Sequence, residues 1–285
     1  MPTFPHDALA QVPAAAAAPA SRSRLFFWLV LLASLNAFAG VAIRIVPERG
    51  LTYAIFELFG ISAIVWVALA AALALLRQDR DPSPPSRLDY AAGAAIVLTA
   101  LLPVAMASAV ILTGLAGWMI ATAPAGSAVR KAGLIALAMT ATLVWGRLFL
   151  ALFSRPLLGA DSWLVARLVG ADQAGNTLTF LDGSGGLAVA PGCSSWQGMS
   201  LALLFWVTVN QWFGVKASLR SAGWLLAALA ATIAINVLRI GAMVRFPGHL
   251  AEIHHGYGWH LSMWATLLAV VALCIFGARR EIFHS

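Results

Sequence analysis

The chain from Tyr90 to Thr122 reads YAAGAAIVLTALLPVAMASAVILTGLAGWMIAT, and none of these 33 residues carries a charge. One helix of that length would measure about 50 Å, whereas the hydrocarbon core of a bilayer is about 30 Å thick. Pro103 and the small residues near it offer a break in the helix. We therefore predict two short membrane spans in this stretch, joined by a tight outer turn near residues 105–108.

Basic residues support the split, because the short cytoplasmic loops of membrane proteins carry an excess of Lys and Arg. Two spans in this stretch place eleven basic residues on the cytoplasmic side, whereas a single span would send the first five of them outward. The eleven are Arg22, Arg24, Arg77, Arg80, Arg87, Arg130, Lys131, Lys216, Arg220, Arg279 and Arg280.

The composition of the whole chain also indicates a membrane protein. Of its 285 residues, 61% are hydrophobic and 10% are charged, whereas a soluble domain has about 45–50% apolar and about 25% charged residues. Apolar runs of helix length recur throughout, as in proteins that cross a bilayer several times. The formal net charge of +7 therefore indicates topology rather than binding to nucleic acid.

We predict eight spans with both termini in the cytoplasm. A disordered tail (residues 1–24) precedes a polytopic membrane domain (residues 25–280), and residues 281–285 form a short cytoplasmic tail. The remaining six spans are expected at Leu25–Ile43, Leu51–Leu76, Ala132–Phe153, Trp196–Phe213, Ala222–Val244 and Trp259–Phe276.

Residues 154–192 form the only long loop between the predicted spans, and this loop falls on the extracytoplasmic side of the membrane. Apolar and polar residues alternate at residues 177–180 and again at 187–189, and the sequence Asp182–Gly186 between them favours a turn. The predicted fold class is therefore an all-α integral membrane protein of about eight transmembrane helices, with one outer loop that carries a short β-hairpin.

The hairpin leads into the stretch Ala190–Trp196, which reads APGCSSW and contains Cys193. An unpaired cysteine in an oxidising compartment is a candidate reactive thiol, and the polar neighbours Ser194, Ser195 and Gln197 suit that role. The alternative is a small residue in a loop. The other cysteine, Cys274, lies about 22 Å along its span, too far for a disulfide, and is expected to be a packing residue.

Two further groups of residues could assist a thiol at the outer face. Arg239 lies about 10 Å deep in its span, where a charge is costly and indicates function, and Asn236 and Thr232 share its helix face. His254 and His255 lie in a short outer loop. Histidine can take the thiol proton and arginine can bind a developing oxyanion. The alternatives are a snorkelling arginine and solvated histidines.

Two other ionisable residues, Glu57 and Arg147, are predicted at matched depths of about 9 Å in the second and fifth spans. We expect them to form a structural ion pair.

These motifs resemble those of the exosortase/archaeosortase family of membrane cysteine transpeptidases. The resemblance rests on Cys193-Ser194 after an outer hairpin, on Asn236-x-x-Arg239 within a span, and on His254-x-x-x-Gly258-Trp259. It implies a Cys, Arg and His catalytic set, here Cys193, Arg239 and His254. It also implies cleavage of a C-terminal sorting signal composed of a short motif, a transmembrane helix and a basic tail. Ser195 departs from the family pattern, which often has Gly there.

The predicted function is a cysteine protease-transpeptidase of the inner membrane, acting on exported proteins at the outer face. Cys193, Arg239 and His254 are the catalytic residues, and Asn236, His255 and Ser194 support them. No metal or nucleotide motif is present, so we expect no cofactor, and the expected partners are the exported substrates and the lipid bilayer. The alternatives are a transporter or lipid-handling protein, which would not need a thiol, and a thiol oxidoreductase, which would need a cysteine pair.

Overall fold

The structure is a computed structural model that describes residues 21–101 and 105–283. The first half contains α1 (Arg22–Arg49), α2 (Leu51–Phe56), η1 (Leu58–Gly60), α3 (Ala63–Gln78), α4 (Arg87–Ala100), α5 (Ala105–Thr122), α6 (Ala128–Thr140), the π-helix η2 (Ala141–Trp145) and α7 (Gly146–Leu152). The second half contains α8 (Ser154–Val169), β1 (Gln173–Ala174), β2 (Thr177–Thr179), β3 (Gly186–Ala188), η3 (Pro191–Cys193), α9 (Ser195–Phe213), α10 (Leu219–Arg245), η4 (Pro247–His249), α11 (Leu250–His255) and α12 (Tyr257–Phe283).

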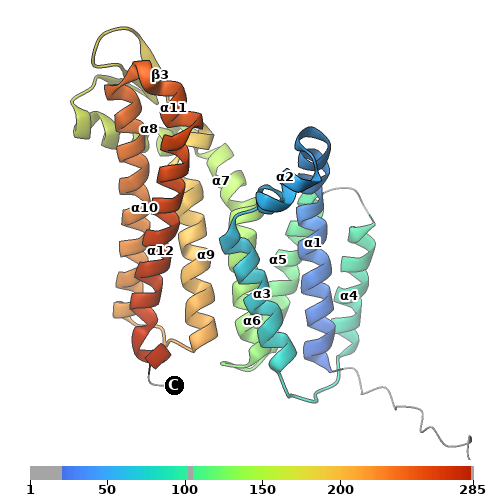
Figure 1. Cartoon of the computed structure of the whole chain (residues 1–285). Helices are drawn as coiled ribbons and strands as arrows, with labels where there is room; N and C mark the ends of the chain where they lie inside the picture. The colour runs from blue at the N-terminus through green and yellow to red at the C-terminus, as the bar shows by residue number, and fades with distance from the viewer. Residues whose placement is uncertain (1–20, 102–104, 284–285) are drawn as a thin grey trace, which may run out of the picture.

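Within the described residues, four helices are long and apolar enough to cross a membrane. They are α1, the continuous helix Ala128–Leu152, α10 and α12. Two shorter apolar helices are Ala63–Gln78 and Met106–Thr122. The long axes of these helices run side by side in Figure 1. This arrangement is consistent with the predicted all-α membrane class.

The predicted second span, Leu51–Leu76, is wrong as a single helix. Leu58, Phe59 and Gly60 all have positive φ angles, of 51°, 57° and 69°, which no right-handed helix can contain. The Ser62 hydroxyl then accepts a hydrogen bond from the Ile64 N–H and caps a new helix, α3. The short helix α2 therefore lies at one end of the bundle beside α1 (Figure 1).

The apolar stretch 90–122 forms two helices, α4 and α5, as its length requires. The turn predicted at residues 105–108 is wrong, because these residues already belong to α5. The α4 helix ends at Ala100, and Pro103 lies outside the described residues. The first of the two helices therefore ends several residues before the turn that we expected.

The described parts of both predicted tails are helical. Arg22 and Arg24 belong to α1, whose first turn is capped by the Ser21 hydroxyl, and α12 continues through residues 281–283. Arg22 forms an ion pair with the fully buried Asp89 of α4, which draws this end of α1 into the bundle. Residues 1–20, most of the predicted disordered tail, lie outside the described residues, as do residues 284–285.

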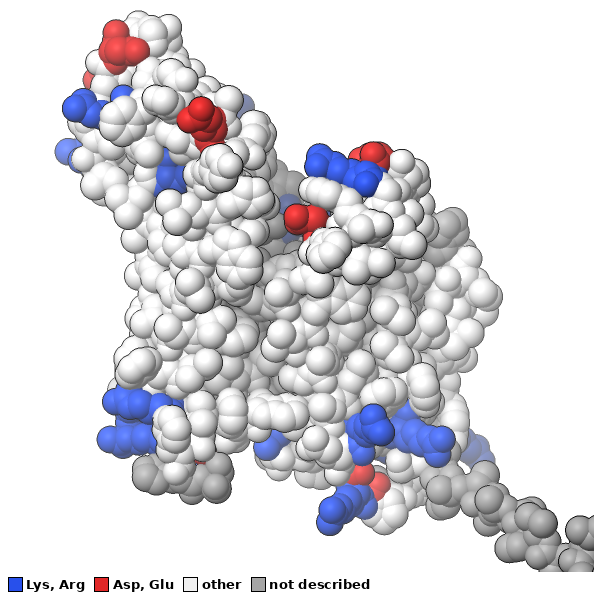
Figure 2. Space-filling view, in the orientation of Figure 1, with Lys and Arg blue, Asp and Glu red and all other residues white. Residues whose placement is uncertain are grey.

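Charged side chains occupy the two ends of the bundle and leave an uncharged band between them (Figure 2). Lys and Arg gather along the lower end in that view. The helix ends located there are the N-termini of α1, α4, α6 and α10 and the C-termini of α3, α5, α9 and α12 (Figure 1). These helix ends and the loops between them carry the eleven basic residues that were predicted to lie on one side of the membrane.

The predicted long loop 154–192 begins with a helix, α8, that we did not expect. Its buried residues Leu158, Asp161, Ser162 and Val165 follow the three-to-four spacing of a helix face. Gly170, in the left-handed conformation, ends it. The loop then forms an antiparallel sheet in the order β1-β2-β3, with Leu178 paired to Leu187.

A small hydrophobic core, separate from the main core of the bundle, lies at the upper end of α10 in Figure 1. Its fully buried members come from α8, β2 and α10, and Cys193 belongs to it. These members are Val165, Leu178, Ile240, Met243 and Val244. This second core fixes the Cys193 segment against α8 and α10, and so positions the candidate site.

Candidate active site

Cys193 is held at the junction between η3 and α9. Pro191 begins the single turn of η3, and the Cys193 N–H donates to the Ala190 carbonyl at 2.8 Å. Ser194 then caps α9, because its hydroxyl accepts a hydrogen bond from the Trp196 N–H at 3.2 Å. Cys193 is a free thiol, and only 6% of its surface is exposed. It is therefore more enclosed than the predicted polar loop implied.

The thiol lies beside His254. The Cys193 Sγ and the His254 Nε2 are 3.0 Å apart, although 61 residues separate them in the chain. His254 lies in α11, so the prediction of a loop at this position is wrong. Pro247 starts the preceding turn, η4, and its fixed φ angle favours helical structure here.

The pKa of His254 is lowered from its ordinary value of 6.5, mainly because the ring is partly buried and secondly because His255 and Arg239 lie nearby. Burial disfavours the charged ring, and so does a neighbouring cation. The neutral form of His254 is therefore favoured, and this is the form that can accept a proton from the thiol.

Asn236 and Arg239 approach Cys193 from α10. The Asn236 side-chain amide donates a hydrogen bond to the Cys193 carbonyl at 2.8 Å, and an Arg239 terminal nitrogen donates to the Asn236 Oδ1 at 3.0 Å. The Arg239 Nε is buried and has no hydrogen-bond partner among the described residues. An unpaired buried donor is costly, so this nitrogen is a candidate donor to a bound molecule.

Thr232 shares the helix face of Asn236 but does not join this network. Its hydroxyl donates to the Ala228 carbonyl in its own helix. Its methyl group lies so close to Gly198 that a Cβ at that position would be only 2.5 Å from it. Thr232 and Gly198 therefore bring α10 close to α9, which positions the polar residues one turn farther along α10.

The backbone N–H groups around the thiol are already engaged. The Cys193 and Ser194 N–H groups donate to the carbonyls of Ala190 and Pro191 within η3, and the Ser195 N–H donates to Asp161 at 3.1 Å. These three amides therefore cannot form an oxyanion hole without rearrangement. Arg239 is the better candidate for that role.

Asp161 of α8 is a site residue that the sequence analysis missed. Its carboxylate is 4% exposed and accepts hydrogen bonds from the Ser194 hydroxyl at 2.8 Å and from the Ser195 hydroxyl at 2.6 Å, besides the Ser195 N–H. The sequence did hold a signal for this residue. Asp161 is spaced three residues from Leu158 and four from Val165, which would place it on the buried face if the segment were a helix. The Ser195 hydroxyl, which a glycine at this position would lack, thus donates a hydrogen bond to Asp161.

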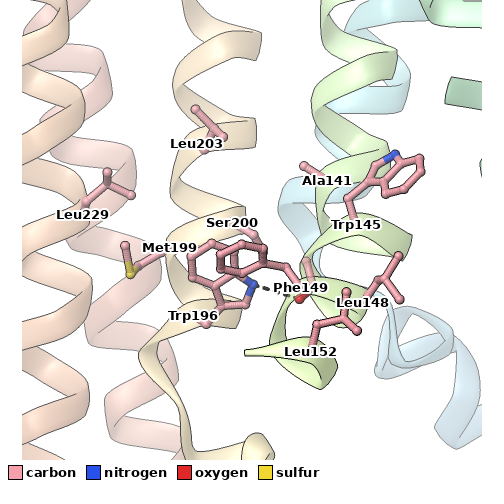
Figure 3. Close-up of a pocket in the computed structure, with 11 residues that line it drawn as sticks. Ala141, Trp145, Leu148, Phe149, Leu152, Trp196, Met199, Ser200, Leu203 and Leu229 are labelled. Atoms are coloured by element: carbon pink, nitrogen blue, oxygen red, sulfur yellow. Dashed lines mark hydrogen bonds between the residues drawn. The ribbon is translucent and has the colours of Figure 1, made fainter. Parts of the chain in front are cut away.

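An apolar pocket of about 450 Å³ is lined in part by Trp196, which follows Cys193 by three residues in the chain. It lies between η2 and α7 on one side and α9 on the other (Figure 3). Trp196 links the two sides, because its indole N–H donates to the Gly146 carbonyl at 2.9 Å and its ring stacks on Phe149. The other lining side chains include Trp145, Leu148, Leu152, Met199 and Leu203.

Three residues weighed in the sequence lie apart from this site. Cys274 is a buried free thiol packed in the main core, as expected of a packing residue. The predicted ion pair between Glu57 and Arg147 is wrong, because both side chains are exposed and neither contacts an opposite charge in the described part of the chain. Glu57 lies in the break between α2 and η1 rather than in a spanning helix.

The structure thus brings together Cys193, His254, His255, Asn236 and Arg239 from three separate segments, with Ser194 anchored alongside. A thiol beside an imidazole, with a guanidinium linked to the Cys193 backbone through Asn236, is suited to nucleophilic attack on a carbonyl group. In comparisons with known proteins, no family model, no curated protein and no solved structure matches the chain.

Proposed function

We propose that the protein is an exosortase-like cysteine protease-transpeptidase of the inner membrane. It cleaves the C-terminal sorting signal of exported proteins at the outer face of the bilayer. The observation that carries this proposal is the 3.0 Å contact between the Cys193 thiol and the His254 imidazole. A nucleophile and a base within hydrogen-bond reach are the minimum requirement for covalent acyl transfer.

The reaction begins when His254 Nε2 takes the thiol proton and the Cys193 sulfur attacks the carbonyl carbon of the scissile peptide bond. The carbonyl oxygen becomes an oxyanion, and Arg239 stabilises it through the Nε donor that has no partner among the described residues. His254 then returns its proton to the leaving amine as the C–N bond breaks. The product is a thioester on Cys193, which an incoming amine or water resolves.

Asn236 connects Arg239 to the backbone of Cys193. It donates to the carbonyl of Cys193 and accepts from Arg239, so that the guanidinium and the thiol keep a fixed separation. A planar guanidinium suits this double task, because one nitrogen can hold Asn236 while another faces the substrate.

The proposed topology has eight spans: α1, α3, α4, α5, Ala128–Leu152, α9, α10 and α12. The basic end of the bundle faces the cytoplasm, and the end that carries Cys193 faces outward. Helices α3 and α4 have 16 and 14 residues and would measure about 24 and about 21 Å. A bilayer accommodates such short helices by local thinning.

The proposed substrates carry a short motif followed by a transmembrane helix and a basic tail, as the family resemblance implies. The apolar pocket beside Trp196 supports a substrate that approaches within the bilayer. The transporter alternative gains no support from the geometry, since Glu57 is exposed in the break between α2 and η1 and pairs with no basic side chain among the described residues.

The test uses exported proteins of the same genome that end in a short motif, an apolar helix and a basic tail. Each is expressed with the wild-type protein, with Cys193→Ala or with the control Cys274→Ala, and cleavage is followed by a change in electrophoretic mobility. We expect Cys193→Ala to abolish cleavage and Cys274→Ala to preserve it at equal membrane levels. Normal cleavage by Cys193→Ala, in a strain without another copy, would refute the proposal.

A further inference from the structure

We propose that His255 is a positioning residue that accepts a hydrogen bond from the His254 Nδ1–H, and so keeps the His254 Nε2 free to take the Cys193 proton. The His254 Nδ1 and the His255 Nε2 are 2.7 Å apart, while the opposite nitrogen of His254 faces the thiol at 3.0 Å. This inference rests on the proposed function, because it assigns a role within the same site.

Tautomer chemistry gives the contact its meaning. A neutral imidazole has one nitrogen that carries hydrogen and one that accepts it. His254 can act as a base through Nε2 only when its hydrogen is on Nδ1, and a hydrogen bond made by the other nitrogen selects the tautomer. Among the described residues, His255 is the hydrogen-bond partner of the His254 Nδ1.

The corner between α11 and α12 holds the two rings in this arrangement. Adjacent residues of a helix diverge by about 100°, yet the two ring centres are only 4.1 Å apart with an interplanar angle of 79°. The α11 helix ends at His255, and a Cβ at Gly256 would lie 2.9 Å from the Glu252 carbonyl oxygen. A Cβ at Gly258 would lie 2.6 Å from the Ile253 Cα. Glycine at both positions therefore allows the tight corner that brings His255 back towards His254.

His255 also assists the charge that forms during the reaction. When the thiol proton moves to the His254 Nε2, the S–H bond breaks, an N–H bond forms and the ring becomes an imidazolium. Its Nδ1–H then donates more strongly to the His255 lone pair, because a hydrogen bond from a charged donor is stronger. His255 is exposed, so water hydrates the outer side of this pair and helps to disperse the positive charge.

This arrangement resembles the third member of a catalytic triad, which orients the histidine and stabilises its cation without taking the proton. A neutral, hydrated imidazole is a weaker acceptor than a buried carboxylate. We therefore expect its removal to slow the reaction of the thiol about tenfold, the upper range for one uncharged hydrogen bond, rather than by the larger factors known for a buried aspartate.

The test measures the rate at which iodoacetamide alkylates Cys193 in the purified, detergent-solubilised chain, in a Cys274→Ala background that leaves one thiol. We expect His255→Leu to slow alkylation about tenfold and His255→Gln to restore the rate to within about threefold, because the Gln amide oxygen can occupy the position of Nε2. His255→Asn should remain slow, since its shorter amide matches the Nδ1 position. His249→Leu is the matched control, because the His249 side chain bonds Glu252 at the surface, away from the thiol.

A wild-type rate in His255→Leu would overturn the inference, as would equally slow rates in His255→Gln and His255→Leu. The contrast between Gln and Asn does not depend on whether the Leu variant folds well. The outcome for His254→Ala separates this inference from the proposed function. If His254→Ala is slow while His255→Leu is normal, only the positioning role fails. If His254→Ala also reacts normally, the base and its positioning residue both fail.

Discussion

Replacement of Asp161 by alanine should both destabilise the protein and misplace the nucleophile. In the structure, the Asp161 carboxylate accepts hydrogen bonds from the Ser194 hydroxyl, the Ser195 hydroxyl and the Ser195 N–H. Ser194 and Ser195 are 7% and 8% exposed, so water cannot readily replace the carboxylate. The same carboxylate sits at the N-terminus of α9, where a negative charge is favourable.

The expected size of the effect follows from these contacts. A buried donor left without an acceptor costs about 1–3 kcal/mol, so three donors set an upper limit of about 9 kcal/mol. The two hydroxyls can rotate towards other acceptors, and the carboxylate no longer has to be desolvated. We therefore expect Asp161→Ala to lower the free energy of unfolding by about 2–4 kcal/mol, with most of the loss arising from the Ser195 N–H.

The assay is unfolding by sodium dodecyl sulfate in mixed micelles, followed by tryptophan fluorescence, together with the alkylation rate of Cys193. Asp182→Ala is the matched control, because Asp182 bonds Ser184 in an exposed turn and should change stability by less than about 0.5 kcal/mol. Ser195→Gly, which loses one hydroxyl contact, should cost about 1 kcal/mol. An Asp161→Ala protein as stable as Asp182→Ala, with unchanged thiol reactivity, would refute this reasoning.

Three further predictions follow from the same geometry. Arg239→Lys should insert normally but cleave substrate about 100–1,000-fold more slowly, because a single ammonium cannot hold both Asn236 and an oxyanion; near-normal cleavage rates would make Arg239 a snorkelling residue. A membrane-impermeant maleimide applied to intact spheroplasts should label Ser184→Cys in the β2–β3 turn but not Ser83→Cys between α3 and α4, and labelling of the latter would contradict the eight-span topology. Substrate cleavage measured from about pH 5 to about pH 8 should fall on the acid side with a midpoint below 6.5, because the lowered pKa of His254 keeps its neutral form populated to lower pH; a midpoint above 6.5 would contradict this.

The membrane class and the order of the candidate site residues could be predicted because both depend on local features of the chain. Apolar length alone separates α4 from α5, and the spacing of Asn236 and Arg239 places them on one face of any helix. The proximity of Cys193 to His254 could not come from periodicity. It was expected from the pairing of a thiol with an imidazole at one membrane face and from the family resemblance.

Three local features were missed, each for a physical reason. The break at residues 57–62 depends on three consecutive positive φ angles, and Leu58 and Phe59 rarely adopt them. The α8 helix was predicted as a loop because its apolar face is short and mixed with polar residues. For the same reason, Asp161 was not recognised as a buried residue. The α11 helix has only six residues and is stabilised by tertiary contacts rather than by its own sequence.

The central claim is that Cys193 forms a covalent bond with its substrate, and the most direct measurement is the mass of the Cys193-containing peptide after expression with a cleavable exported protein. We expect a fraction of that peptide to carry the substrate's new C-terminus as a thioester, released by hydroxylamine and absent from Cys193→Ala. Cleavage of the substrate in full, with Cys193 unmodified throughout the reaction and dispensable for it, would contradict the account.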